Sequence, residues 1–330
     1  MPGLERVPAG ARRFARRVLP AGFVDAVRGY LVRWYLAPGN VSRKGPIKRW
    51  FRHHVLRRPP VLHRVIVHVT DHCNLNCKGC THFSNIASPA FADPERFEDE
   101  MRRLSGVFPV ITEIFLLGGE PLLHPDVESF VTTTRRLFPA SRINLMSNGV
   151  LVTRMPESFW HTMHDADAWL MLDLYPIGLP VAQIEDLTRI HGVKLEWTDP
   201  RAEFFKLPLD LEGRQDPADS FERCRGANNC VVLRGGRLYP CAYAAYVDLF
   251  QKRFGVEGLE PSSEDSISVV DPRGAWQIMD FLLKPVPWCR FCDFNSMETY
   301  SWARSTRSID EWTSPAVVPV GGPSREEPES

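Results

Sequence analysis

The feature that most constrains the fold is an alternation of short apolar runs and amphipathic stretches between residues 63 and 200. The runs are rich in Val, Ile and Leu and end at Gly, Pro, Asn or Asp, which is typical of buried strands. They cover residues 64–70, 113–119, 142–149, 169–176 and 193–199. Strands that alternate with helices form parallel sheets, and functional residues lie at the carboxyl ends of such strands. We therefore expect an α/β fold with a parallel, barrel-like sheet.

Local signals predict several other elements. Asp93 is placed to cap a helix that begins at Pro94, and apolar residues follow it at helical spacing. A second helix is expected to open at Pro125. Beyond residue 200 the alternation stops, and we expect a hairpin with a Gly-Gly turn over residues 231–240 and a helix over about residues 272–283.

Three cysteines follow the first predicted strand directly. Cys73, Cys77 and Cys80 have the spacing C-x3-C-x2-C in the loop CNLNCKGC. Thiolates bind zinc and iron-sulfur clusters alike. A structural zinc site uses four protein ligands, whereas three ligands leave a coordination position open. The spacing therefore favours an iron-sulfur site, and a structural or zinc site is the alternative.

Two further pieces follow the next two predicted strands, so they are expected at the same edge of the sheet. The sequence GGEP occupies residues 118–121, and SNG occupies residues 147–149. Together with the cysteine loop, these pieces resemble the radical SAM superfamily. In that family three cysteines hold a [4Fe-4S] cluster, and S-adenosylmethionine binds its fourth iron. The resemblance implies a partial (β/α)6 TIM-type barrel of the radical SAM type with a small, cysteine-rich C-terminal extension.

The resemblance also assigns roles to individual residues. Cluster ligands would be Cys73, Cys77 and Cys80, and cofactor-binding residues would be Gly118, Gly119, Glu120, Pro121, Ser147 and Asn148. In the family, the GGEP motif receives the methionine ammonium, and polar strand ends bind the ribose or the carboxylate. The residue before the third cysteine is often aromatic in the family and stacks near adenine, whereas here it is Gly79, and Phe83 is a candidate substitute.

A second group of cysteines lies in the C-terminal part of the chain. Its members are Cys224, Cys230, Cys241, Cys289 and Cys292. The group resembles the twitch or SPASM extensions of radical SAM enzymes, which carry auxiliary [4Fe-4S] clusters, and its size suits a twitch domain with one cluster. Four ligands are needed, so either Cys224 or Cys230 is spare, and we favour Cys224 as the ligand. The spare thiol is either a hydrogen-atom donor or a buried apolar group, and zinc is the alternative metal.

Charge is distributed unevenly along a chain of zero net charge. Of the 40 Lys and Arg residues, 14 lie in residues 1–60, beside only two of the 40 Asp and Glu residues. This leaves 26 basic and 38 acidic residues in the remainder. The basic segment either binds a phosphate-bearing partner or packs on the acidic body. The sequence has no apolar run that suggests a membrane span or a secretory signal, so we expect a cytoplasmic protein.

Four segments are predicted on this basis: a basic extension (1–60), a radical SAM core (61–215), a twitch/SPASM-like auxiliary domain (216–312) and a disordered tail (313–330). The segment at 203–216 either covers the mouth of the barrel as a substrate loop or is a plain linker. Weaker candidates for catalysis, besides Cys230, are His82, Asp173 and Tyr175.

The resemblance implies an enzyme that cleaves S-adenosylmethionine and abstracts a hydrogen atom from its substrate. We expect a carbohydrate, aminocyclitol or nucleotide-sugar substrate in antibiotic or polysaccharide biosynthesis, with oxidation, epimerisation or radical C–C coupling as the outcome. A flavodoxin or ferredoxin is the expected electron donor, and nucleic acid is not an expected partner. The alternatives are modification of a ribosomal peptide and, from another class, a zinc-stabilised nucleic-acid-binding protein.

Overall fold

The computed structural model describes residues 61–198, 203–224, 226–227, 229–269 and 274–314. The chain divides into two compact units, residues 1–58 and 59–330. The first unit lies outside the described residues, as does the predicted basic extension. The predicted disordered tail also lies outside them, except for its first two residues. The predicted boundary between residues 215 and 216 stays a prediction.

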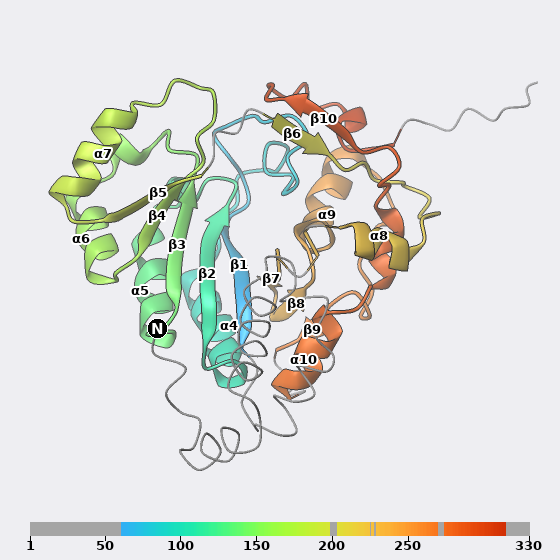
Figure 1. The fold of residues 1–330 in the computed structure, drawn as a ribbon, viewed down its shortest axis with the longest axis horizontal. Helices are drawn as coiled ribbons and strands as arrows, with labels where there is room; N and C mark the ends of the chain where they lie inside the picture. Colours follow the sequence, from blue (N-terminus) through green and yellow to red (C-terminus); the bar gives the residue numbers. More distant parts are fainter. Residues whose placement is uncertain (1–60, 199–202, 225, 228, 270–273, 315–330) are drawn as a thin grey trace, which may run out of the picture. The chain divides into compact units, whose positions relative to one another are not determined.

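A parallel sheet forms the centre of the second unit. Its strands are β1 (Leu62–Thr70), β2 (Ile111–Gly118), β3 (Arg142–Ser147), β4 (Trp169–Leu172) and β5 (Lys194–Trp197). Each strand pairs in parallel with the next one along the chain (Figure 1). All five lie within or beside the apolar runs of the sequence, and the predicted α/β fold is confirmed.

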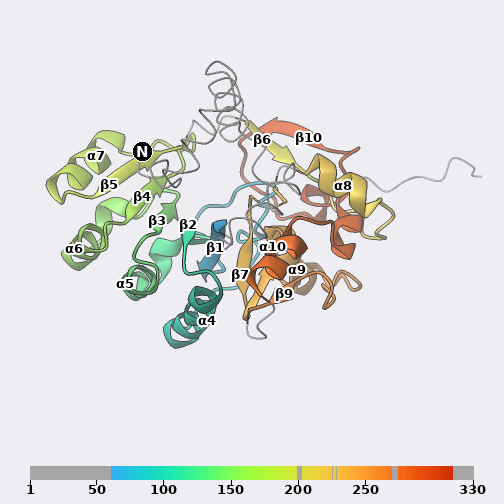
Figure 2. The same cartoon turned by 60° about the horizontal axis from the view of Figure 1, so that its bottom comes forward.

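Helices connect these strands and lie along one side of the sheet, as Figures 1 and 2 both show. They are α4 (Pro94–Val107), α5 (Val127–Leu137), α6 (Glu157–Asp165) and α7 (Val181–Ile190). Helix α4 begins as predicted, because the Asp93 side chain accepts a hydrogen bond from the backbone N–H of Arg96 at 2.8 Å.

The expectation that α5 opens at Pro125 was wrong by two residues. A 3-10 turn, η2 (Pro121–Leu123), follows β2, and the helix begins only at Val127. The backbone N–H of Asp126 donates to Nδ1 of His124 at 3.0 Å, which closes this turn before the helix starts. A second 3-10 turn, η3 (Val152–Arg154), follows β3.

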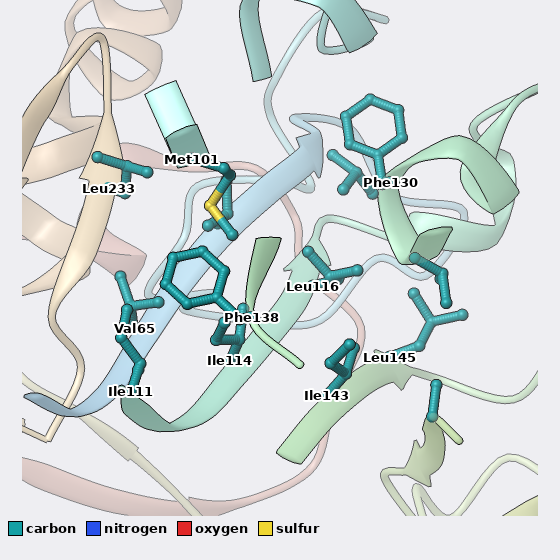
Figure 3. Packing of buried hydrophobic residues seen from close by; sticks show 14 of the residues in the cluster. Val65, Met101, Ile111, Ile114, Leu116, Phe130, Phe138, Ile143, Leu145 and Leu233 are labelled. Carbon is teal, nitrogen blue, oxygen red and sulfur yellow. The ribbon is translucent and has the colours of Figure 1, made fainter. Parts of the chain in front are cut away.

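The main apolar core lies between the sheet and helices α4 to α7. Alternate residues of β1, such as Val65 and Val67, face this core, whereas Ile66 belongs to a second cluster on the opposite face. Figure 3 shows Met101 of α4 and Phe130 of α5 among the strand residues. Burial on both faces explains why the strands read as continuous apolar runs.

The sheet continues beyond β1 with residues from the C-terminal part of the chain. The predicted hairpin is present as β7 (Val232–Arg234) and β8 (Arg237–Tyr239), and β9 (Ile267–Ser268) completes the order β5-β4-β3-β2-β1-β7-β8-β9. Strand β7 pairs in parallel with β1 through Ile66 and Val232. In the described part of the chain, the sixth parallel strand therefore lies at the β1 edge and does not follow β5.

The remaining elements come from the C-terminal part of the chain, and their residues contribute to both apolar clusters. They are β6 (Glu203–Lys206), α8 (Pro217–Arg223), α9 (Ala242–Phe254), α10 (Ala275–Leu282), η4 (Pro287–Phe291), β10 (Glu298–Ser301) and η5 (Ile309–Glu311). Helix α10 matches the helix predicted near residues 272–283. Strands β6 and β10 pair in an antiparallel manner. No helix among the described residues is both long and apolar enough to cross a bilayer.

Candidate active site

The cysteine loop begins where β1 ends and returns to the same strand end. The backbone N–H of Asp71 donates to the carbonyl of Ala90 at 3.2 Å, and that of Ala92 donates to the carbonyl of Val69 at 3.0 Å. These bonds close the base of the loop on the carboxyl end of β1. The three cysteines of the loop are thus held at the edge predicted from the sequence.

Hydrogen-bond donors surround the sulfur atoms of Cys73 and Cys77. The Cys73 Sγ accepts from the backbone N–H of Leu75 at 3.3 Å and from Nδ2 of Asn148 at 3.6 Å. The Cys77 Sγ accepts from the indole N–H of Trp302 at 3.2 Å. Donors of this kind stabilise thiolates and the clusters that thiolates bind.

Burial affects the titration of two of the three thiols. It raises the pKa of Cys73 to about 12, and the nearby Glu120 carboxylate and the two other cysteines add to this rise. Burial also raises the pKa of Cys80, although the backbone N–H groups that follow it in the chain oppose the shift. A cationic cluster corner would offset this penalty on each thiolate, so the residues fit such a group.

The two glycines of GGEP allow β2 to approach the cysteine loop closely. The backbone N–H of Gly119 donates to the carbonyl of Thr70 at 2.9 Å, and that of Glu120 donates to the carbonyl of His72 at 3.1 Å. A Cβ atom on Gly118 would lie 2.0 Å from the carbonyl oxygen of Thr70, and one on Gly119 would lie 2.0 Å from that of His72. No other residue fits here, because any side chain would push the loop away.

Glu120 is fully buried, and its carboxylate is fixed by three hydrogen bonds. Oε1 accepts from the Ser147 hydroxyl at 2.8 Å and from the backbone N–H of Leu122 at 3.0 Å, and Oε2 accepts from the backbone N–H of Asn148 at 2.9 Å. Burial raises the pKa of Glu120 to about 7, and these hydrogen bonds oppose the rise. A buried carboxylate of this kind is stabilised by a cationic partner.

Asn148 joins the carboxylate to the cysteine loop. Besides its contact with Cys73, its Nδ2 donates to Oδ1 of Asn74 at 2.8 Å. The ends of β1, β2 and β3 therefore meet in one hydrogen-bonded network, from Cys73 through Asn148 to Glu120. The structure brings together the residues that the sequence placed at three separate strand ends.

The comparisons with known proteins agree with this geometry. Residues 67–191 match the Radical SAM superfamily. That range contains the cysteine loop, GGEP and the Ser147–Asn148 pair at the ends of three adjacent parallel strands. Residues 67–191 thus form a radical SAM domain. The cofactors of this superfamily are a [4Fe-4S] cluster and S-adenosylmethionine.

Several curated relatives share this part of the chain. Molybdenum cofactor biosynthesis protein 1 of Bos taurus is 31% identical over 171 residues, which cover 51% of this chain and 24% of the relative. GTP 3',8-cyclase 2 of Mycobacterium tuberculosis is 34% identical over 91 residues, which cover 27% of this chain and 25% of the relative. The match thus spans about a quarter of the length of each of these relatives.

Among solved structures, the chain is similar to BtrN in complex with AdoMet and 2-DOIA, with 20% sequence identity and a TM-score of 0.45. That match covers 72% of this chain and 96% of BtrN. The chain is also similar to Streptococcus suis SuiB, with 16% identity and a TM-score of 0.35 over 53% of this chain and 43% of SuiB.

The side chains of His82 and Phe83, which follow the third cysteine, pack against other residues of the protein. Nδ1 of His82 lies 2.7 Å from Nε2 of His68, and desolvation lowers the pKa of His82 to about 3. Phe83 is fully buried and packs against Tyr243, Phe250 and Trp312. The suggestion that Phe83 stacks near adenine was therefore wrong, because its ring belongs to the apolar core.

Asp173 and Tyr175 lie at the end of β4, beside the network of Glu120. The carboxylate of Asp173 accepts from the Thr198 hydroxyl at 2.9 Å, and the Tyr175 hydroxyl lies 3.4 Å from it. The Tyr175 ring also stacks on Phe204 of β6, with ring centroids 5.9 Å apart. The segment at 203–216 thus begins beside the rim, where the sequence placed it, and the catalytic roles of Asp173 and Tyr175 stay predictions.

The C-terminal cysteines gather around a second site. Four of them line one small cavity, namely Cys224, Cys241, Cys289 and Cys292. Burial raises the pKa of each of the last three thiols, and neighbouring cysteines add to the rise. Cys230 does not line this cavity, although burial raises the pKa of its thiol as well. This arrangement supports the preference for Cys224 as a ligand.

Neither cysteine group resembles a site for one ion. Among the residues that the structure describes, no group of three or more His, Cys, Asp or Glu side chains is arranged to hold a metal ion.

No motif in the sequence indicates that the C-terminal region contacts the cysteine loop. Besides Trp302, the side chains of Tyr300, Glu311 and Trp312 hydrogen-bond to the backbone of the loop. They lie more than 220 residues from the loop along the chain, and no spacing rule connects the two segments.

Proposed function

We propose that this radical SAM protein abstracts a hydrogen atom from the sugar part of a nucleotide, nucleotide-sugar or aminocyclitol substrate. The hydrogen-bonded network that joins Cys73, Asn148 and Glu120 is the observation that carries this proposal, because it would position a cluster beside an ammonium group. When bound and reduced, the cluster supplies the electron that cleaves S-adenosylmethionine to methionine and a 5′-deoxyadenosyl radical.

The residues of the chain have distinct tasks in this proposal. Cys73, Cys77 and Cys80 would hold the cluster. Glu120, when ionised, would accept hydrogen bonds from the methionine ammonium. The Ser147 hydroxyl and the Asn148 N–H keep that carboxylate in a single orientation.

Two observations support a substrate that carries a nucleotide. The curated relatives include GTP 3',8-cyclases, whose name states that they act on GTP. In addition, the basic charge of residues 1–60 suits a phosphorylated substrate. We expect biosynthesis of a natural product or a polysaccharide as the setting, and a flavodoxin or ferredoxin as the electron donor.

We also propose that the C-terminal region is a twitch-like domain with a second [4Fe-4S] cluster. Cys224, Cys241, Cys289 and Cys292 would be its ligands, because they share one cavity. Anaerobic reconstitution followed by iron and sulfide analysis tests this assignment. About eight irons per chain are expected for the wild type, about four for C224S and about eight for C230S. Equal iron loss in both variants would contradict the choice between these two cysteines.

The substrate proposal is tested by deuterium transfer. The reconstituted protein, dithionite and S-adenosylmethionine are incubated with sugar-deuterated GTP, nucleotide sugars or aminocyclitols, and 5′-deoxyadenosine is analysed by mass spectrometry. Deuterium in 5′-deoxyadenosine from any of them supports the proposal. Transfer only from a peptide would favour modification of a ribosomal peptide. A protein that contains zinc without iron and binds nucleic acid in a salt-dependent manner would refute the proposed radical SAM activity.

A further inference from the structure

The cysteine loop is bound along its length by the segment 300–312, near the C-terminus of the described chain. Cys77 and Arg304 form an antiparallel bridge. On either side of this bridge, the backbone N–H of Lys78 donates to the carbonyl of Ala303, and the backbone N–H of Ser305 donates to the carbonyl of Asn76, both at 2.9 Å. The segment thus adds a short strand to the part of the loop that carries the second cysteine.

Side chains of the segment 300–312 extend this contact to the third cysteine. The Tyr300 hydroxyl donates to the carbonyl of Lys78 at 2.7 Å, and the Trp312 indole N–H donates to the carbonyl of Cys80 at 2.9 Å. The Glu311 carboxylate accepts from the backbone N–H of Gly79 at 3.2 Å. Three consecutive loop residues are therefore fixed by three different side chains.

This contact explains why a glycine precedes the third cysteine. Gly79 has a φ of +62°, and a Cβ atom there would lie 2.6 Å from the Tyr300 hydroxyl oxygen. The space beside this position is thus filled by the segment 300–312. The aromatic residue expected from the radical SAM family cannot be accommodated at Gly79.

Trp302 differs from the other residues of the segment, because its donor reaches a sulfur atom. Its indole N–H lies 3.2 Å from the Cys77 Sγ, within the range for a hydrogen bond to sulfur. We propose that Trp302 is a positioning residue that sets the reduction potential of the cluster held by Cys73, Cys77 and Cys80. This inference rests on the proposed function, in which Cys77 is a cluster ligand.

The physical reason is the charge of the cluster. Reduction adds one electron, so a donor on a ligand sulfur stabilises the reduced state more than the oxidised state. Loss of the donor makes the cluster harder to reduce and moves its potential to more negative values. The same reduction starts the cleavage of S-adenosylmethionine, so Trp302 would influence how readily an electron donor activates the protein.

The test compares Trp302→Phe with Tyr300→Phe. Both variants lose one hydrogen bond from the same segment to the same loop, but only the first bond ends on sulfur. Each reconstituted protein is titrated anaerobically, and the reduced cluster is quantified by electron paramagnetic resonance. We expect W302F to lower the reduction equilibrium constant at least about threefold, which is about 28 mV at 59 mV per tenfold change. We expect the potential of Y300F to equal that of the wild type.

Iron content separates this inference from the proposed function. If the wild type binds no [4Fe-4S] cluster, or if C77A keeps full iron, the ligand assignment fails. If W302F holds its iron and its potential equals that of the wild type, the role of Trp302 is refuted and the ligand assignment stands. An equal shift in W302F and Y300F would also refute it, because it would reflect a general loosening of the loop.

A second measurement applies if W302F does not retain its cluster. The wild-type protein is labelled with indole-15N tryptophan, and the reduced cluster is examined by pulsed electron paramagnetic resonance. A 15N hyperfine coupling is expected, since the indole nitrogen lies 3.2 Å from a ligand sulfur. Absence of that coupling would overturn the inference.

Discussion

Replacement of Glu120 by Gln keeps the shape of the side chain and removes its charge. The carboxylate accepts three hydrogen bonds of 2.8 to 3.0 Å in a fully buried position. The Gln carbonyl oxygen can replace Oε1, which accepts from Ser147 and Leu122. The Gln amide group then faces the backbone N–H of Asn148, and an unpaired buried donor costs about 1–3 kcal/mol.

The loss of charge acts in the opposite direction. Burial raises the pKa of Glu120 from 4.5 to about 7, and each pKa unit corresponds to about 1.4 kcal/mol. Since the pKa is higher in the folded state, ionisation of Glu120 lowers the free energy of unfolding. This loss of stability is absent below pH 4.5, grows through pH 7 and reaches about 3 kcal/mol at pH 8. The free energy of unfolding of E120Q should therefore stay within about 2 kcal/mol of the wild type at pH 8 and fall below it at pH 5.

Binding of S-adenosylmethionine should respond much more strongly. An ion pair between the ammonium and a partly screened carboxylate contributes about 2–4 kcal/mol, so E120Q should raise the Kd about 30- to 700-fold. Anaerobic calorimetry on the reconstituted protein measures this change, with iron content as the control. The wild type should lose up to about tenfold in affinity per pH unit below 7, whereas E120Q should show no such dependence. A Kd of E120Q within threefold of the wild type, at full iron content, would refute this role of Glu120.

Two further predictions concern the backbone. G119A places a Cβ atom 2.0 Å from the carbonyl oxygen of His72, so it should lose the loop cluster and more than about 3 kcal/mol of stability. The control G106A, with open space around the added Cβ atom, should keep its iron. Iron analysis and chemical denaturation measure both effects, and a stable G119A with full iron content would contradict the close approach. D93A should lose about 1 kcal/mol in denaturation, and D126A, whose side chain makes no capping bond, should lose little; equal losses would argue against capping.

The sequence predicted the elements that have a local cause. Strands β1 to β3 are buried on both faces over most of their length, so each appears as an apolar run. Helix α4 follows from Asp93 at its cap and Pro94 at its first turn. The start of α5 was placed too early, because the bond between Asp126 and His124 depends on the turn geometry around GGEP.

Contacts between distant segments had no such signal. The pairing of Ile66 with Val232 joins residues that are 166 positions apart, and the short strand β7 is compatible with many partners. In the same way, the motifs identified Cys77 but not Trp302, since a hydrogen bond between side chains 225 residues apart follows from the tertiary fold. The sequence also left Cys224 and Cys230 as alternatives, and only the shared cavity distinguishes them.

The pairing of β7 with β1 makes the core and the C-terminal region interdependent. Strand β1 carries the cysteine loop and is hydrogen-bonded on both sides, to β2 and to β7. A protein truncated at residue 215 would expose one side of β1 as an unprotected edge, which is a site for aggregation. Excision or exchange of the C-terminal region would therefore not yield an independent catalytic module, and engineered fusions should keep this region together with the core.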